Sequence, residues 1–274
     1  DLVQVCLDGI INKTSYENWE VLIIDNDSQE EKSHEFFKSV ASDKVKVKKY
    51  AGKFNYSAIN NFGAKHAKGD VLLLLNNDIE MIKDDWLTEL VSHAMRPGIG
   101  AVGARLYYAN DCVQHDGIII GIGGVAGYAN PGLKRSAIGS FGGSRLIRNF
   151  SAVTAAALAV RKAIFDEAGG LDDLNLEVAF NDVDFCLKLV NQGYSNVYLP
   201  HVELIHHESK TRGKELSIHE KERFHFEYTL LRQNWLPLIE NDPFYNKHLS
   251  KEFEDFRLKH PKDYKPLLEN IQSF

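Results

Sequence analysis

The sequence has few cysteines, no long hydrophobic run and no excess of positive charge. Three cysteines in 274 residues, far apart and without C-x-x-C spacing, argue against a disulfide framework or a thiolate zinc site and fit a reducing compartment. With 38 acidic against 32 basic residues the net charge is -6, so no basic field is present to hold a nucleic-acid backbone. The longest strong apolar run, Val71 to Leu75, is far shorter than the roughly 18 residues that cross a bilayer. Neither a nucleic-acid partner nor a membrane-spanning segment is expected.

The beginning of the chain also lacks two features. There is no basic segment leading into an apolar stretch, which a secretory signal peptide would have, and there is no initiator methionine. We therefore expect a chain without an export signal that is a fragment of a longer protein. Its composition, 44% hydrophobic and 26% charged, is that of a folded globular protein with one large or two small domains.

Apolar patterns predict strands that alternate with helices. Strands are expected at 21–24, 45–47, 71–75 and 194–200, with 45–47 at an edge and 71–75 central, parallel and covered on both faces. Helices are expected at 2–11, from Ser57 as cap to about residue 67, and at 84–94, 162–170, 181–192 and 217–235. The glycine-rich segment 121–144 predicts a long irregular loop, for which a lid is one interpretation. The fold class is α/β: a mixed, mostly parallel sheet flanked by helices, with a helical C-terminal tail.

Three polar clusters are candidates for chemistry, and each also has a structural explanation. Asn76-Asn77-Asp78 follows a buried strand, where it forms either an ordinary turn or a site for a hard cation. Asn181-Asp182-Val183-Asp184 opens a helix, where acids either complement the helix dipole or act as a general base. His206-His207-Glu208-Ser209 follows a strand, so only one histidine faces a given site, as a structural residue or as a ligand of Mn²⁺ or Mg²⁺.

Taken together and in this order, these segments resemble the inverting family 2 glycosyltransferases with a GT-A fold, particularly those that build bacterial surface polysaccharides. The resemblance covers about residues 4 to 213 and includes two further parts, a strand with an acidic loop at 18–28 and a helix at 54–63. Asn76-Asn77-Asp78 is similar to the family's DXD metal motif, with Asn76 in place of the first acid. Asn181-Asp182 is similar to its ED motif, with Asn181 in place of Glu, and Arg212-Gly213 is similar to its flexible loop.

The resemblance implies a role for each site residue. Asp182 would be the catalytic base, and Asp78 with His206 would hold a divalent metal, Mn²⁺ or Mg²⁺, with His207 in reserve. The other implied residues bind the nucleotide sugar or lie on the acceptor side: Asp25, Asp27, Asn61, Asn77 and Asp78 for the first, and Thr154, Asn181 and Asp184 for the second. The donor would be a UDP- or dTDP-sugar and the acceptor a saccharide or lipid-linked saccharide, which implies a cytoplasmic location with possible association with the inner membrane face.

The resemblance also shows a departure at the start of the chain. The family opens with an apolar strand and a Pro-Thr-Tyr-Asn-like loop that helps bind the nucleotide, and this sequence has neither. A sheet without that strand would expose apolar faces and unpaired backbone groups. A non-catalytic nucleotide- or glycan-binding module, or an inactive fragment, is therefore the alternative to an enzyme. A nucleotidyltransferase is a third reading, although no glycine-rich, lysine-bearing phosphate loop is present.

We expect one glycosyltransferase domain over residues 1–215 and a helical extension over 216–274 that packs on it. The tail segment Asp242-Pro243-Phe244-Tyr245-Asn246 resembles a feature of one branch of polysaccharide-synthesis enzymes.

Overall fold

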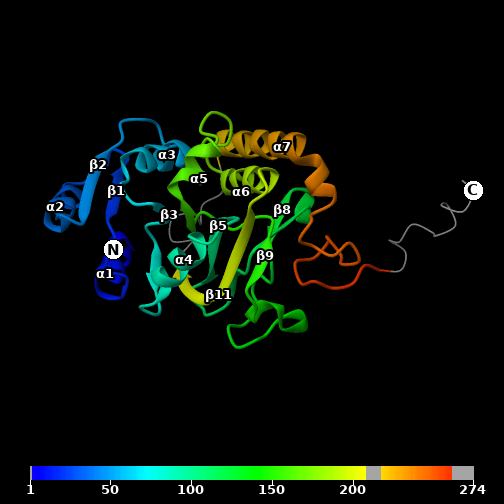
Figure 1. Ribbon diagram of the computed structural model, residues 1–274. Helices are drawn as coiled ribbons and strands as arrows, with labels where there is room; N and C mark the ends of the chain where they lie inside the picture. The colour runs from blue at the N-terminus through cyan, green and yellow to red at the C-terminus, as the bar shows by residue number, and fades with distance from the viewer. Residues whose placement is uncertain (1, 208–216, 261–274) are drawn as a thin grey trace, which may run out of the picture.

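A computed structural model describes residues 2–207 and 217–260. The fold is mixed α/β, with helices packed around a twisted central sheet (Figure 1). The C-terminal helix α7 lies across the top of the molecule in this view, beside α6, and the N-terminal elements α1, β1, α2 and β2 form the left side. In the described part of the chain, no helix is both long and apolar enough to cross a membrane.

The N-terminal elements follow the sequence prediction closely. Helix α1 (Leu2–Asn12) precedes strand β1 (Val21–Asp25), helix α2 (Glu31–Val40), which the sequence analysis did not predict, and strand β2 (Val45–Lys49). Strand β2 pairs only with β1, in parallel, so its lysines alternate with valines at an edge as predicted. The prediction for the next helix, α3 (Tyr56–His66), is wrong in its cap: Asn55 accepts from the Ala58 N–H at 2.8 Å. Ser57 is instead buried, and its hydroxyl donates to the Leu176 carbonyl.

The central sheet has seven strands, of which five run in the order β3-β10-β5-β11-β4. Strand β6 pairs with β5, and β9 pairs with β11. Their bounds are β3 Val71–Leu75, β4 Ile79–Met81, β5 Ile99–Tyr107, β6 Val113–His115, β9 Arg148–Phe150, β10 Ala157–Arg161 and β11 Ser195–His206. Among the described strands, only β1 with β2 and β5 with β11 pair in parallel. The sheet is mixed as predicted, but the expectation that most of its pairings are parallel is wrong, because β10 inserts antiparallel between β3 and β5.

Strand β3 is not the central parallel strand that its five apolar residues predicted. It pairs with β10 alone, antiparallel, and its residues alternate between buried and half-buried. The strand that is covered on both faces is β5, in which every residue is buried. At Gly103 of β5 an added Cβ would lie 2.5 Å from the Val153 Cβ, so only glycine allows this close packing.

The sheet is interrupted between β1 and β3. Strands β1 and β2 form a separate two-stranded sheet, and a cavity of about 1830 Å³ lies against both β1 and β3. Apolar residues of both strands line it, including Val21, Ile23, Val71 and Leu73, all half-buried. The structure therefore has exposed apolar surface between β1 and β3, as expected for a sheet that lacks the family's opening strand.

The remaining helices cover the sheet. Helix α4 (Trp86–Ala94) has Asp85 as its N-cap, and α5 (Lys162–Glu167) ends before Gly169 and Gly170, both at positive φ as predicted. Helix α6 (Asn181–Asn191) begins at the predicted residue, and its N-cap is Phe180 in the left-handed region. The predicted strand at 194–200 is part of the longer β11, which continues past Pro200 with a register shift between Leu199 and Glu203.

The segment predicted as an irregular loop is partly ordered. It contains the 3₁₀ turns η1 (Ile122–Gly124) and η2 (Ser140–Arg145) and strand β8 (Ala126–Tyr128), which pairs with β7 (Ile118–Ile120). Helix α7 (Ile218–Glu240) begins at the capping box of Ser217 and Glu220, and it runs past the predicted end at Trp235. Its Leu231 and Ile239 belong to the same apolar core as strand β10, so this helix packs on the sheet domain.

The predicted tail motif has a clear structural role. The carboxylate of Asp242 is buried and accepts from the Ile120 N–H at 2.8 Å, the Ser151 hydroxyl at 2.6 Å and the Phe244 N–H at 2.9 Å. It therefore ties the segment after α7 to β7 and to the residue after β9.

Candidate active site

The cavity beside β1 and β3 brings together most of the residues predicted for the site. Seven of them line it: Asp25, Asn77, Asp78, Thr154, Asn181, Asp182 and His206. They come from the ends of β1, β3 and β11, from the turn before β10 and from the start of α6. The tertiary fold thus collects side chains that are far apart in the sequence around one space.

Asp78 and His206 form the first part of the site. Asp78 lies in the turn between β3 and β4, and His206 is the last residue of β11, which pairs antiparallel with β4. His206 Nε2 lies 3.1 Å from Asp78 Oδ1, and this buried oxygen has no hydrogen-bond partner within the described residues. Burial raises the pKa of Asp78, but the electrostatic attraction of the His206 ring in its charged form, with a smaller effect of His207, outweighs burial and holds the pKa below its usual value.

Two neighbouring amides fix the orientation of the His206 ring. His206 Nδ1 lies 2.7 Å from Gln114 Oε1, and Nε2 lies 3.2 Å from Asn76 Nδ2. An amide oxygen accepts only, so Nδ1 carries the proton and Nε2 presents its lone pair toward Asn76 and Asp78. This is the tautomer that a metal ligand needs. The amide of Asn76 also lies beside Tyr56, whose hydroxyl is 3.2 Å from Asn76 Oδ1 and has a single proton to share between this oxygen and the Ala155 carbonyl.

His207 points to a different partner. Its backbone N–H donates to the Asp78 carbonyl at 3.0 Å, while its ring nitrogen lies 2.9 Å from Glu80 Oε2. Adjacent strand residues face opposite sides, and here His206 faces the cavity. Glu208, Ser209, Arg212 and Gly213, which also belonged to the predicted motif, lie outside the described residues.

The pair Asp78 and His206 fits a hard divalent cation. A carboxylate oxygen buried without a donor and an imidazole lone pair face the same point, and both are ligand types of Mn²⁺ or Mg²⁺. Among the described residues, no group of three or more His, Cys, Asp or Glu side chains is placed to hold a metal. The remaining ligands of such an ion would have to be substrate oxygens or water.

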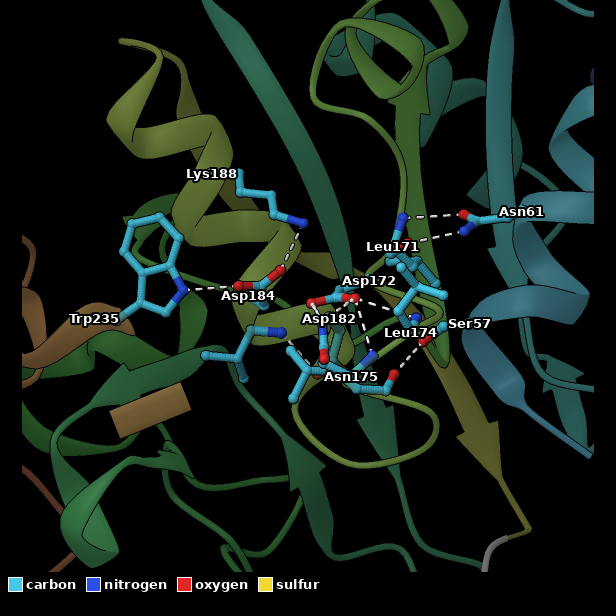
Figure 2. Close-up of polar contacts among 12 residues, drawn as sticks. Ser57, Asn61, Leu171, Asp172, Leu174, Asn175, Asp182, Asp184, Lys188 and Trp235 are labelled. Atoms are coloured by element: carbon cyan, nitrogen blue, oxygen red, sulfur yellow. Dashed lines mark hydrogen bonds and ion pairs between the residues drawn. The ribbon is translucent and has the colours of Figure 1, made fainter. Parts of the chain in front are cut away.

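Asp182 lies in the first turn of α6, at the centre of Figure 2. Its carboxylate is half-buried and accepts from the Ala155 N–H at 3.0 Å and from its neighbour Val183 N–H at 2.8 Å. Burial raises the pKa of Asp182 above its ordinary value, although these N–H groups and the Thr154 side chain oppose the shift by stabilising the charge. A carboxylate with a raised pKa, facing a cavity, is a stronger general base than a free aspartate.

The segment 154–156, whose Ala155 N–H donates to Asp182, is fixed by hydrogen bonds to His115 and Tyr56. The Thr154 N–H lies 3.3 Å from Nε2 of the buried His115, whose Nδ1 lies 2.9 Å from the Ala104 carbonyl. Burial lowers the pKa of His115 to about 4, so this ring stays neutral. On the other side, the Tyr56 hydroxyl donates to the Ala155 carbonyl at 3.0 Å.

Three predicted residues do not reach the cavity. Asp27 is exposed and pairs with Lys49 at 2.7 Å. The amide of Asn61 is fully used by the segment after α5: it exchanges hydrogen bonds with the Leu171 backbone at 2.8 and 3.0 Å (Figure 2). It also donates to Asp173 at 3.0 Å. Asp184 points away from Asp182, toward Trp235 and Lys188, both at 2.8 Å (Figure 2).

For these three residues, the predicted contacts with donor or acceptor find no support in the structure, because their polar atoms already have partners elsewhere. Asp25 does line the cavity, where its Oδ1 accepts from the Ser28 N–H at 2.9 Å, and Asn77 is exposed to it.

Four residues that shape the site were not predicted from the sequence, namely Tyr56, Asn76, Gln114 and His115. For Asn76, the sequence predicted only that it replaces the first acid of the metal motif, but in the structure its amide lies between Tyr56 and His206. Gln114 and His115 lie on the short strand β6, and nothing in the local pattern separates them from ordinary buried strand residues. Only the pairing of β6 with β5 reveals them, because it directs Gln114 to His206 and His115 to Ala104.

These features define an α/β protein with carboxylates and an imidazole around one cavity, and comparison with known proteins specifies its family. The family model of glycosyl transferase family 2 matches residues 1–166, and the chain belongs to this family. It is 36% identical over 265 residues to the O-antigen biosynthesis protein RfbC of Myxococcus xanthus, covering 96% of this chain and 20% of that protein. It is 41% identical over 264 residues to the uncharacterized protein y4gI of Sinorhizobium fredii, covering 96% of this chain and 29% of that protein.

The chain therefore spans less than a third of the length of the curated relatives that it matches. Among solved structures, GalNAc-T7 with UDP, GalNAc and Mn²⁺ superposes with a TM-score of 0.62 at 15% identity, over 90% of this chain and 49% of that one. At this identity the likeness shows the GT-A fold and nothing about substrates.

Proposed function

We propose that this chain transfers a sugar from a nucleoside diphosphate sugar to a saccharide hydroxyl with inversion, in the synthesis of a cell-surface polysaccharide. The observation that carries the proposal is that Asp78, Asp182 and His206 line one cavity in a chain of glycosyl transferase family 2. The O-antigen biosynthesis relative supports the polysaccharide, and the UDP in the GalNAc-T7 structure supports a UDP-sugar as the donor to test first, with a dTDP-sugar second.

Each residue has a separate task in this proposal. Asp25 and Asn77 bind the nucleotide at the end where β1 and β3 finish. Asp182 removes the proton from the acceptor hydroxyl, whose oxygen attacks the anomeric carbon while the diphosphate leaves from the opposite face. The new glycosidic bond forms as the sugar-phosphate bond breaks, so a single displacement inverts the anomer. Thr154 and Asn181, which line the cavity beside Asp182, are assigned to the acceptor side in this proposal.

The divalent metal is the cofactor of the proposal. Asp78 Oδ1 and His206 Nε2 would hold Mn²⁺ or Mg²⁺, and Gln114 keeps the imidazole in the required tautomer. When bound, such an ion offsets the negative charge that develops on the leaving diphosphate. The Mn²⁺ in the GalNAc-T7 structure supports this choice of metal.

The experiment that tests the proposal separates binding from transfer. The Asp182→Asn variant should lose about 10²- to 10⁴-fold in transfer rate, because general-base assistance contributes that much, while it retains UDP affinity in calorimetry with Mn²⁺. Asp166→Asn, which removes an exposed carboxylate on α5, is the matched control and should transfer at the parent rate. Equal rates for Asp182→Asn and the parent would remove Asp182 from its role. UDP binding without turnover in the parent would favour the non-catalytic module.

We also propose that the protein associates peripherally with an anionic membrane surface, where a lipid-linked acceptor would lie. The loop between β8 and β9, at the bottom of Figure 1, exposes four apolar side chains: Ile138 at 61%, Phe141 at 96%, Leu146 at 56% and Ile147 at 51%. From Gly117 to Phe150 the sequence contains no acidic residue but four basic ones, of which Lys134 and Arg145 are exposed, while Arg135 pairs with Asp111 and Glu203. Exposed apolar residues among basic ones suit the interface of an anionic bilayer.

Sedimentation with vesicles tests this association. The parent should bind vesicles that contain phosphatidylglycerol more strongly than pure phosphatidylcholine vesicles, and Phe141→Ser should weaken the binding. Phe253→Ser removes an apolar residue exposed at 47% in the tail and serves as control. Equal sedimentation of the parent with both vesicle types, or of Phe141→Ser and the parent, would contradict the proposal.

A further inference from the structure

The turn immediately before Asp182 is strained. Phe180 adopts φ 60° and ψ 7°, a left-handed conformation that a bulky side chain rarely occupies and that costs conformational energy. It serves as the N-cap of α6, and its side chain gives no cap hydrogen bond. Such a conformation persists only where surrounding contacts hold it, so the structure must contain groups that fix this turn.

The holding group is a carboxylate from the C-terminal helix. Glu227 of α7 is 1% exposed, and its two oxygens accept from two consecutive backbone N–H groups, those of Val178 at 3.0 Å and Ala179 at 2.9 Å. These are the residues directly before Phe180. A buried carboxylate whose two oxygens each accept from a backbone N–H group holds that backbone in a fixed position. Burial has removed water from both oxygens, so breaking either hydrogen bond would leave an oxygen without a partner, which costs free energy.

Aromatic packing from the same helix holds the ring of Phe180. Its centroid lies 5.4 Å from that of Phe224 and 6.3 Å from that of Tyr228, which flank Glu227 on the face of α7 that meets the turn. Among the described residues, the cationic side chain that contacts Glu227 is Arg223, whose Nε lies 4.0 Å from Oε1. The two backbone N–H groups, at 3.0 and 2.9 Å, are closer partners of Glu227. Helix α7 therefore contacts both the backbone of the strained turn, through Glu227, and the side chain of Phe180, through Phe224 and Tyr228.

We infer that Glu227 is a positioning residue, which fixes the strained turn 178–180 so that Asp182 faces the cavity at the start of α6. The inference rests on the proposed role of Asp182 as base. Helix α6 begins at Asn181, so a rotation of the turn at Phe180 would change the direction in which the Asp182 side chain points. Glu227 itself does not line the cavity and touches neither donor nor acceptor. Its effect should therefore appear in turnover and not in nucleotide affinity.

Variants at Glu227 test the inference through the separation of turnover from binding. Glu227→Ala removes both acceptors and should lower kcat at least tenfold, while the dissociation constant for UDP with Mn²⁺ stays within about twofold of the parent's. Glu227→Gln retains one acceptor oxygen and should restore part of the lost turnover. Glu222→Ala, which removes an exposed glutamate from the same helix, is the matched control and should behave as the parent. All assays are run well below the lowest melting temperature of the set.

A second measurement is independent of catalysis. Amide hydrogen exchange of the peptide that covers residues 176–183 should accelerate in Glu227→Ala and remain unchanged in Glu222→Ala, since the Val178 and Ala179 amides lose their acceptors. Unchanged turnover in Glu227→Ala, unchanged exchange in this peptide, or a parallel loss of turnover and UDP affinity would each overturn the inference. If the parent itself shows no transfer, the proposed function fails, and the exchange experiment still decides whether Glu227 holds the turn.

Discussion

His206 Nε2 lies 3.1 Å from Asp78 Oδ1, where the end of strand β11 meets the turn between β3 and β4. Neither residue alone makes a metal site, and a turn aspartate or a strand-end histidine is common in any α/β protein. Their contact follows from the antiparallel pairing of β11 with β4, in which His206 is the partner of Ile79.

The orientation of His206 by Gln114 gives a prediction for metal binding. Gln114→Leu keeps a side chain of similar size but removes the oxygen that fixes the tautomer of His206. We expect Mn²⁺ affinity, measured by calorimetry in the presence of UDP, to fall by about 10- to 100-fold, the usual effect of removing such a partner. Gln233→Leu, on the exposed side of α7, is the control. Equal Mn²⁺ affinity for Gln114→Leu and the parent would show that the tautomer does not depend on Gln114.

The environment of Asp182 predicts a pH dependence of transfer. The base must be ionised, and burial raises its pKa, so the transfer rate should fall as the pH drops through this raised value. Thr154→Val removes a hydrogen bond that stabilises the ionised form, so the pKa should rise further and the acidic limb of the rate profile should move to higher pH. Thr229→Val on α7 should leave the profile in place. A limb that moves to lower pH in Thr154→Val would contradict this account.

The buried His115 predicts a loss of stability in mild acid. Its pKa is lowered from 6.5 to about 4 in the folded protein. As the pH falls below 6.5, the unfolded chain takes up a proton that the folded protein does not, so stability is lost between about pH 6.5 and pH 4.

The size of this loss follows from the same shift. Between pH 7 and pH 5, His115 should lower the free energy of unfolding by about 2 kcal/mol, since one pKa unit corresponds to about 1.4 kcal/mol. The free energy of unfolding, measured in urea at both pH values, should change with pH by about this amount less in His115→Gln than in the parent. His225→Gln, at an exposed position, should show the same pH dependence as the parent. The same dependence in His115→Gln and the parent would assign the acid sensitivity to other groups.

The anchor at Asp242 predicts the cost of detaching the tail. Asp242→Ala would leave the Ile120 N–H and the Ser151 hydroxyl buried without an acceptor. At about 1 to 3 kcal/mol for each buried group left unpaired, the free energy of unfolding should fall by about 3 kcal/mol in a urea titration. Glu252→Ala, ten residues further along at an exposed position, should change it by less than about 0.5 kcal/mol. A small effect of Asp242→Ala would mean that water replaces the carboxylate.

The comparison of sequence with structure shows what local patterns can predict. The strands at β1 and β2, the glycine end of α5 and the start of α7 near Ser217 follow from signals within a few residues, and all are found. The role of β3 did not follow, because five apolar residues in a row look the same in a central strand and in one that borders a cavity. The fully buried strand β5 went unpredicted for a related reason: β10 and β11 pair with it and α4 and α6 pack on it, and most of these elements are distant in sequence.

By itself, the sequence determined the family and the identity of the charged groups, since motif order and side-chain chemistry are properties of the chain alone. Only the tertiary structure decided which of these groups share a cavity. Asp182 and Asp184 are two residues apart in the first turn of one helix, yet the first faces the cavity and the second bonds Trp235 and Lys188. The physical reason is that a helix turns by about 100° at each residue and that its rotation is set by what packs on it, here α7 with Glu227 and Trp235.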